Sequence, residues 1–261
     1  MVAVAEGRAT AVKSRIFVGV GGWNFAPWRG PFYPKGLPQS QELHFASRQL
    51  NSVEINSTFY GLQKPATFQK WHDETPDAFV FSVKAPRFVT QRKQLGESAA
   101  SIERFLGSGV LRLGSKLGAI NWQLAPTKTF DAAEVGRFLE LLPARIEGRP
   151  VRHALEVRHA SFDCEEFIAL AREHGVAIVE AGDSQYPHLA ARTAPFSYLR
   201  LMGTKASAPK GYSPAALARW RQYTETLARG GDVYLYFISG AKERNPLAAR
   251  AFLEMGTVPL S

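Results

Sequence analysis

The sequence predicts an α/β protein built as one closed barrel of eight parallel strands, each followed by a helix. Short apolar runs rich in β-branched and aromatic residues occur eight times, and segments with a helical spacing of apolar residues separate them. Regular alternation of strand and helix requires a parallel sheet. Eight such units in 261 residues fit the (β/α)8 or TIM barrel, which commonly takes about 250 residues as one domain.

The predicted strands are runs of about four to eight mostly apolar residues, bounded by polar or turn-forming residues. The first, Ile16-Phe17-Val18-Gly19-Val20, is typical of a buried strand. In chain order the eight strands cover residues 16–20, 53–56, 79–84, 117–124, 151–157, 176–180, 196–201 and 233–238.

Seven segments between and after these strands have the periodicity of helices. Pro65 stands at a helix start, where its missing N–H does no harm, and Asp131 and Ser161 are expected to be N-caps. Segment 182–195, after the sixth strand, is short and interrupted by proline, so an irregular or missing helix is expected there. The predicted helices cover residues 39–50, 65–74, 98–113, 132–142, 161–174, 214–228 and 245–255.

One domain over residues 15–261 is expected, because no linker or change of composition divides the chain. Residues 1–14 carry charges and lack an apolar core, so they are expected to form a flexible tail rather than a secretory signal. An open, doubly wound sheet is the alternative fold. Its dinucleotide fingerprint is missing, because Gly19-Val20-Gly21-Gly22 leads into Trp23 and a proline-rich loop instead of a helix.

Composition excludes several classes of protein. The only cysteine, Cys164, rules out an intramolecular disulfide, and its acidic neighbours would raise the pKa of its thiol. No run approaches the roughly 18 consecutive apolar residues that a membrane-spanning helix needs. We therefore expect no association with a membrane and a cytoplasmic location. The net charge of +9 favours anionic partners.

Polar residues collect where the predicted strands end, which in a TIM barrel is where the active site lies. These residues come in pairs on the second, third, fourth, fifth and seventh predicted strands: Glu54 and Asn56, Ser82 and Lys84, Asn121 and Gln123, Glu156 and Arg158, and Tyr198 and Arg200. Within each pair the spacing is two, so both members face one way and the apolar residues between them face the helices. If this parity holds, three acids and three bases converge on one pocket. The acids are Glu54, Glu156 and Asp183, the bases are Lys84, Arg158 and Arg200, and the intervening residues are Ile55, Val83, Trp122, Val157 and Leu199.

Several stretches together resemble the YecE-like family, domain of unknown function 72, from about Ile16 onward. The resemblance implies a TIM barrel, in agreement with the strand count, and a molecular function that is not established. The matching stretches are 19–23, 28–34, 53–60, Trp71, 75–84, 117–124, 156–161 and 198–200.

Three positions depart from what this resemblance implies. Gln91 stands where the family usually has histidine, Met202 stands where it also has histidine, and Ile238 stands where it has asparagine. Losing two imidazoles and an amide removes groups that transfer protons or form hydrogen bonds. Whether these changes leave the site active is left open.

The first functional hypothesis is an enzyme that acts by acid/base chemistry on a small anionic (phosphorylated or carboxylated) or sugar-like substrate. Whether the protein is an enzyme, which cofactor it uses and its oligomeric state are left open. The candidate catalytic residues are Glu54, Glu156, Lys84 and Asp183. The candidate substrate-binding residues are Trp23, Asn56, Tyr60, Gln123, Arg158, His159 and Arg200.

Three alternatives compete with it. Charged strand ends could form a purely structural salt-bridge network. The charge and the run from Lys84 to Lys93, with Phe88 inside it, are also compatible with a nucleic-acid binding or processing protein, although a solvated loop is favoured. A metal-dependent hydrolase or isomerase would use Glu54, Glu156, His159 and Asp183, but the nearby cations would repel a metal ion.

Overall fold

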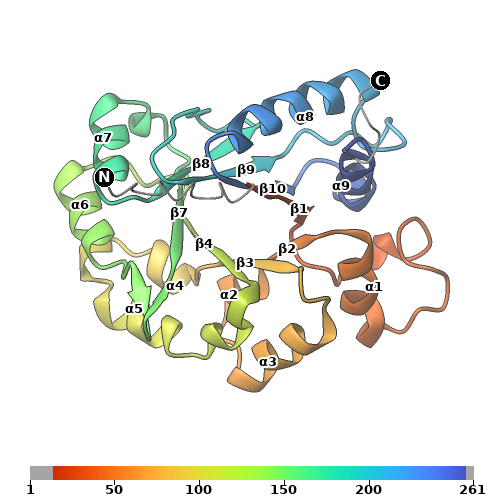
Figure 1. Ribbon diagram of the computed structural model, residues 1–261. Helices are drawn as coiled ribbons and strands as arrows, with labels where there is room; N and C mark the ends of the chain where they lie inside the picture. The colour runs from red at the N-terminus through yellow and green to blue at the C-terminus, as the bar shows by residue number, and fades with distance from the viewer. Residues whose placement is uncertain (1–13, 257–261) are drawn as a thin grey trace, which may run out of the picture.

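Eight parallel strands curl into a barrel in the computed structural model, which describes residues 14–256 (Figure 1). All eight predicted strands are confirmed, with ends that differ by at most two residues. The predicted tail falls, apart from Ser14, outside the described residues. The strands are β1 (Ile16–Val20), β2 (Ser52–Ile55), β3 (Val80–Lys84), β4 (Leu117–Gln123), β7 (Arg152–Glu156), β8 (Ala177–Gly182), β9 (Phe196–Leu201) and β10 (Asp232–Phe237). Around the sheet their order is β1-β10-β9-β8-β7-β4-β3-β2.

Helices surround the strands (Figure 1). They are α1 (Glu42–Gln49), α2 (Ser57–Tyr60), α3 (Pro65–Glu74), α4 (Arg87–Thr90), α5 (Ala99–Leu106), α6 (Ala132–Glu140), α7 (Glu165–Glu173), α8 (Pro214–Ala228) and α9 (Asn245–Glu254). A two-stranded hairpin of β5 (Arg145–Ile146) and β6 (Arg149–Pro150) precedes β7. Within residues 14–256 no helix is both long and apolar enough to pass through a membrane.

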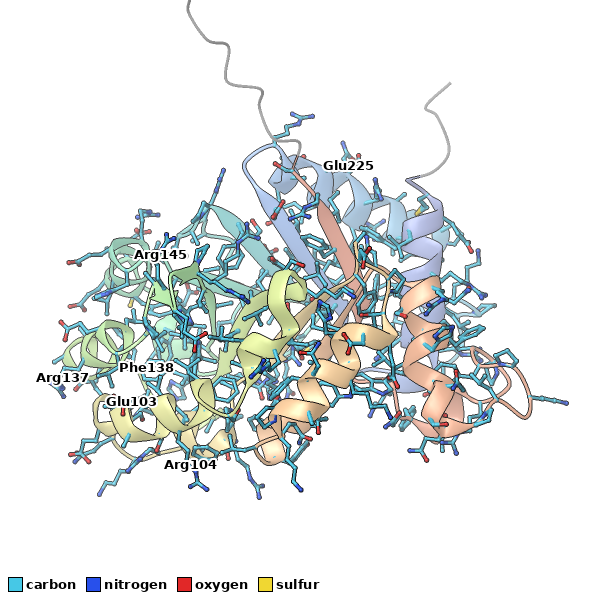
Figure 2. All side chains as sticks on the ribbon, turned by 60° about the horizontal axis from the view of Figure 1, so that its bottom comes forward. Glu103, Arg104, Arg137, Phe138, Arg145 and Glu225 are labelled. Atoms are coloured by element: carbon cyan, nitrogen blue, oxygen red, sulfur yellow. The ribbon has the colours of Figure 1, made fainter. Side chains whose placement is uncertain are left out.

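The outer helices are amphipathic. On α6, Arg137 points away from the molecule, whereas the next residue, Phe138, is buried (Figure 2). The predicted cap of this helix is confirmed, because the Asp131 carboxylate accepts a hydrogen bond from the Glu134 N–H at 2.8 Å. Residues 183–195 contain no helix, as predicted for the segment after the sixth strand.

Two helix predictions are wrong in detail. The predicted helix 98–113 ends at Leu106, and Gly109, with φ +104°, turns the chain into a separate 3-10 helix over Val110–Lys116. Ser161 does not cap α7, which begins only at Glu165. Its hydroxyl instead accepts a hydrogen bond from the Phe130 N–H at 2.8 Å. The short helices α2 and α4, at one turn each, carry no periodicity that a sequence pattern could show.

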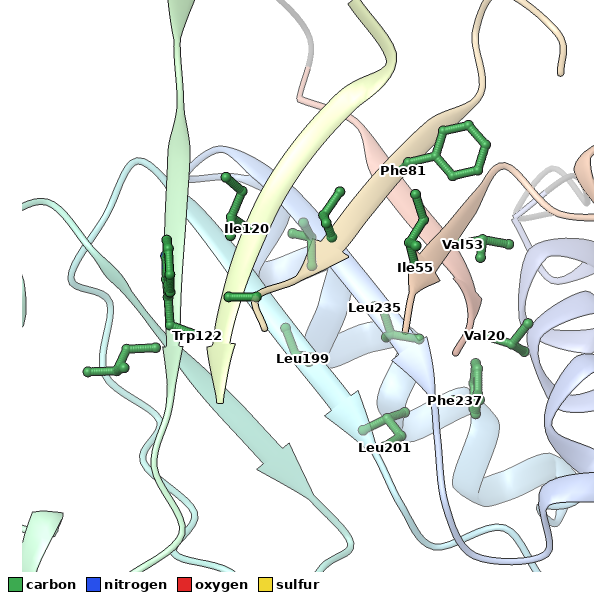
Figure 3. Packing of buried hydrophobic residues seen from close by; sticks show 14 of the residues in the cluster. Val20, Val53, Ile55, Phe81, Ile120, Trp122, Leu199, Leu201, Leu235 and Phe237 are labelled. Atoms are coloured by element: carbon green, nitrogen blue, oxygen red, sulfur yellow. The ribbon is translucent and has the colours of Figure 1, made fainter. Parts of the chain in front are cut away.

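Two layers of apolar side chains fill the molecule. The outward-facing residues of the strands pack beneath the helices (Figure 3), and the five residues predicted to face that way all belong to this layer. The inward-facing residues form a second cluster inside the barrel, which includes Phe17, Phe196, Tyr198, Tyr234 and Tyr236. The interior of the barrel is therefore a packed core rather than a pore.

The barrel closes between β1 and β2 with few backbone hydrogen bonds. The Gly22 N–H donates to the Glu54 carbonyl at 2.8 Å near the carboxyl ends of these strands. At the other end the Asn51 amide accepts from the Val18 N–H at 2.6 Å and donates to the Ile16 carbonyl at 2.9 Å. A side-chain amide thus replaces part of the ladder between the two strands.

Gly19 permits this closure. A Cβ atom at Gly19 would lie 1.9 Å from the Ser52 carbonyl oxygen, so Gly19→Ala must push β1 away from β2. We expect the free energy of unfolding, measured with urea, to fall by about 3 kcal/mol. Gly61→Ala is the matched control, because nothing lies within 4 Å of its Cβ position, and it should change stability by less than about 0.5 kcal/mol. Equal stability of the two variants would contradict this account of closure.

Candidate functional site

A cavity of about 1080 Å³ opens above the carboxyl ends of the strands. Side chains from β3, β4 and β9 line it together with the loops that follow β1, β2, β7 and β10. Seven of the eleven residues predicted for the site contribute to its lining: Trp23, Asn56, Tyr60, Lys84, Gln123, Arg158 and Arg200. Gln91 and Ile238, two of the three positions that depart from the family pattern, line it as well.

Arg200 forms the centre of the cavity floor. Its Nη1 donates to Glu156 Oε2 at 2.6 Å and its Nη2 to Glu54 Oε1 at 3.0 Å. Both carboxylates are fully buried. Glu54, Glu156 and Arg200 come from β2, β7 and β9, so one guanidinium ties three separate strands together.

Asn121 and Tyr198 complete the hydrogen bonding of these carboxylates. The Asn121 amide donates to Glu54 at 3.3 Å and to Glu156 at 3.2 Å, and the Tyr198 hydroxyl donates to Glu54 Oε2 at 2.6 Å. Burial and the Glu54 charge raise the pKa of Tyr198 well above its ordinary value, so it stays a donor. Sequence reasoning placed both residues at strand ends but did not include them in the site. Their inward parity, shared with Gln123 and Arg200, was the available signal.

Arg158 provides a second guanidinium at the floor. Its Nε and Nη2 both donate to Glu156 Oε1, at 2.9 and 2.8 Å. The guanidinium also lies 4.4 Å from the centre of the Tyr186 ring. Tyr186 belongs to the irregular segment after β8, where no periodicity could have indicated its position.

The charge of Glu156 is strongly stabilised. Burial alone would raise its pKa, but the adjacent Arg200 and Arg158 guanidinium groups outweigh burial and hold the pKa at about 2. Every oxygen of Glu54 and Glu156 accepts a hydrogen bond, and neither residue lines the cavity. These contacts favour a supporting role for both carboxylates over the direct acid/base role that the sequence suggested.

Lys84 is the lysine at the floor. Its Nζ lies 3.9 Å from the centre of the Phe59 ring. Burial, followed by the charge of the nearby Arg200, lowers the pKa of Lys84 to about 8 against the opposing effect of the two buried carboxylates. The Thr58 hydroxyl on α2 donates to the Lys84 carbonyl at 2.7 Å and fixes this strand end. A lysine with such a pKa can gain or lose a proton near neutral pH.

Aromatic side chains form the walls and rim. Trp23 packs edge-on against Trp71, with ring centres 5.1 Å apart, and Tyr60 is 72% exposed at the mouth. The Lys242 Nζ lies 4.1 Å from the centre of the Phe25 ring, and both residues line the cavity. The site thus offers flat apolar surfaces beside several cations.

Two predicted residues lie elsewhere. Asp183 follows β8 in a left-handed conformation, with φ +51°, and this turns its side chain away from the barrel axis. Its carboxylate accepts a hydrogen bond from the Trp220 indole at 2.8 Å and lines a second cavity. His159 lies beyond the end of β7, where its Nδ1 pairs with the Ser161 hydroxyl at 2.8 Å.

These positions remove the basis of the metal-site alternative. The predicted ligand set included Asp183 and His159, which do not meet the two glutamates. In residues 14–256 no group of three or more His, Cys, Asp or Glu side chains is arranged to hold a metal ion. Arg200 occupies the space between Glu54 and Glu156, where a cation would have to bind.

The site carries an excess of positive charge. Lys84, Arg158 and Arg200 face two carboxylates at the floor, which leaves one positive charge uncompensated when Lys84 is protonated. Two buried polar atoms of lining residues, Asn56 Oδ1 and Arg200 Nε, also have no hydrogen-bond partner among the described residues. A cavity of this kind suits an anionic, hydrogen-bonding ligand.

Comparison with known proteins places this arrangement in context. Residues 17–259 match a family model described as "Protein of unknown function DUF72". The UPF0759 protein YecE of Escherichia coli (strain K12) is 28% identical over 150 residues, which are 56% of this chain and 50% of YecE. The UPF0759 protein YunF of Bacillus subtilis (strain 168) is 32% identical over 75 residues, 29% of this chain and 26% of YunF. The match thus spans at most half the length of these curated relatives.

Solved structures share the fold. A DUF72 family protein from Thermotoga maritima MSB8 superposes with a TM-score of 0.75 at 24% identity, over 94% of this chain and 100% of that one. A second, from Enterococcus faecalis V583, gives 0.70 at 17% identity, over 94% and 99%. A sugar phosphate isomerase/epimerase from Parabacteroides distasonis ATCC 8503 gives 0.54 at 11%, over 98% and 99%. At these identities the likeness shows the fold alone.

The depressed pKa of Glu156 predicts an acid-labile component of stability. Because the unfolded carboxyl takes up a proton first, the stabilisation is present at neutral pH and is lost as pH falls from about 4.5 to about 2. We expect Glu156→Gln to remove about 3 kcal/mol of this pH dependence, measured as the free energy of unfolding against pH. Glu103→Gln, on the exposed face of α5, should keep the wild-type slope. An unchanged slope in Glu156→Gln would contradict the ionised state.

Proposed function

The chain belongs to the DUF72 family of proteins of unknown function, and on this premise we propose that it is an enzyme for a small phosphorylated or carboxylated substrate, with Lys84 as the proton-transferring group. One observation carries the proposal. Five cationic side chains and one carboxylate, that of Glu74, line the cavity, whereas Glu54 and Glu156 are buried beneath it. The cationic residues are Lys70, Lys84, Arg158, Arg200 and Lys242. An anion entering the cavity therefore meets positive charge first.

The two arginines are suited to hold the anionic group of the substrate. Each is already fixed by a carboxylate, so little side-chain entropy is lost when the ligand binds. Glu54 and Glu156 act through the arginines as positioning residues. Trp23 and Tyr60 offer flat surfaces for the remainder of the substrate.

Lys84 is suited to the proton transfer. With a pKa of about 8, part of the population carries a neutral amine at physiological pH, and this amine can take a proton from a C–H or O–H group next to the bound anion. The resulting ammonium returns the proton to a neighbouring atom, as an isomerisation requires. The family histidines that the resemblance implies are absent at Gln91 and Met202, which leaves Lys84 as the titratable group at the floor with a pKa near neutrality.

The fold of the sugar phosphate isomerase/epimerase named above is compatible with such a substrate. This support is an analogy of fold, and TIM barrels host many unrelated reactions. The charged groups of the cavity therefore carry more weight in the choice of substrate class than the neighbour does.

A ligand screen tests the substrate class. We expect sugar phosphates or hydroxycarboxylates to raise the melting temperature of the wild type, and Lys84→Met and Arg158→Met each to weaken the binding of a hit by about tenfold or more. Lys93→Met, an exposed basic residue away from the cavity, is the control for net charge and should bind as the wild type does. Exclusive binding of oligonucleotides, or equal binding by all three variants, would contradict the proposal.

The pH dependence of ligand binding tests Lys84 itself. Its ammonium is present below a pH of about 8, so affinity for an anionic hit should fall as pH rises through that value. Lys84→Arg keeps its charge across the range and should bind with an affinity that is nearly constant up to pH 10. A wild-type affinity that is equally constant, measured by calorimetry, would show that Lys84 does not titrate at the site.

A further inference from the structure

The missing helix after β8 leaves a second cavity on the outer side of the barrel. In Figure 1 the chain runs from β8 to β9 without a helix in between. Residues 183–190, the loop after β9 and the first half of α8 enclose a space of about 810 Å³ there. This cavity shares no lining residue with the cavity described above.

The acids in this cavity are already engaged. Glu180, on the outward face of β8, accepts hydrogen bonds from His188 at 2.7 Å and from the Tyr223 hydroxyl at 2.8 Å. Asp183 accepts one from the Trp220 indole at 2.8 Å and lies against Tyr212. Burial, followed by the charge of Asp183, raises the pKa of Tyr212, so its hydroxyl stays protonated.

The cations in this cavity are not engaged. Lys205 and Arg219 are exposed, both line the cavity, and neither side chain forms an ion pair or hydrogen bond with any described residue. His188, whose Nε2 pairs with Glu180, lines the same cavity. The side-chain groups at the mouth of this cavity that are free to form hydrogen bonds are thus mostly donors.

The walls are aromatic. Trp220 and Tyr223 project from successive turns of α8 with ring centres 5.9 Å apart, and Tyr212 adds a third ring from the loop. We propose that this cavity is a second binding site, for an organic carboxylate carried on a planar apolar body. The carboxylate is held by Lys205 and Arg219, and the apolar body lies against Trp220 and its aromatic neighbours. This site does not depend on the function proposed for the first cavity.

The competing possibility is that this cavity, with its two acids and three aromatic rings, binds an organic cation placed above the ring faces. It is disfavoured because the carboxylates already accept hydrogen bonds while the two cations have no partner. Probes of equal shape and opposite charge separate the two cases.

Phenylacetate and phenethylamine are such probes, and the indole N–H signal of Trp220 is the reporter. The signal is assigned by its absence from the spectrum of Trp220→Phe. We expect phenylacetate to shift the Trp220 signal in a saturable way, phenethylamine to leave it in place, and inorganic phosphate to move it far less than phenylacetate. In the double variant Lys205→Ala/Arg219→Ala the affinity for phenylacetate should fall at least tenfold. Both residues are exposed, so the fold should survive.

Lys84→Met serves as the control for the first cavity and should leave the phenylacetate titration of Trp220 unchanged. Stronger binding of phenethylamine than of phenylacetate would overturn the proposal. So would a phenylacetate affinity that survives the double variant, or a Trp220 signal that no probe moves. None of these outcomes bears on the ligand screen for the first cavity, so the two proposals can fail separately.

Discussion

The pairing of two buried carboxylates with one guanidinium is the interaction on which the upper half of the barrel depends. Glu54 and Glu156 are removed from water, which would be costly for lone charges, and Arg200 lies between them with Asn121 and Tyr198 as further donors. Removing Arg200 would leave the buried charge of Glu54 without an ion pair and would leave Glu156 paired with Arg158 only. The network joins β2, β4, β7 and β9, so a set of ion pairs also fixes the shape of the cavity floor.

The same network gives the cavity its chemical character. A carboxylate beneath each guanidinium keeps Arg158 and Arg200 in place, and the third cation, Lys84, stays partly desolvated above the Phe59 ring. Burial and the neighbouring guanidinium then bring the pKa of Lys84 down to about 8. The network that stabilises the cavity floor therefore also contributes to the pKa of Lys84. Glu54 and Glu156, which by themselves look like acid/base residues, hold the two guanidinium groups in place.

Much of this arrangement could be predicted from the alternation of side chains along a strand, in which every second residue faces the same way. That alternation placed Glu54, Lys84, Glu156 and Arg200 on the inner face of four different strands, and the fold class followed from the alternation of strand and helix. Parity fails where a strand has ended. Asp183 takes a left-handed backbone conformation and His159 enters a turn, so neither side chain follows the pleat. The extent to which each carboxylate is buried also has no sequence signal, because it depends on side chains from distant strands.

The segment after β8 shows the other limit of sequence reasoning. Its lack of a helix was predicted, yet its contacts were not: Tyr186 packs against Arg158 at one cavity, and His188 pairs with Glu180 at the other.

A direct NMR titration of the Lys84 amine, observed at its Nζ nitrogen in the wild-type protein, tests the central electrostatic claim. The account predicts a pKa of about 8. A value at the ordinary lysine level of about 10.4 would show that Lys84 is solvated and lies outside the influence of Arg200. It would contradict the proton-transfer role proposed for this lysine.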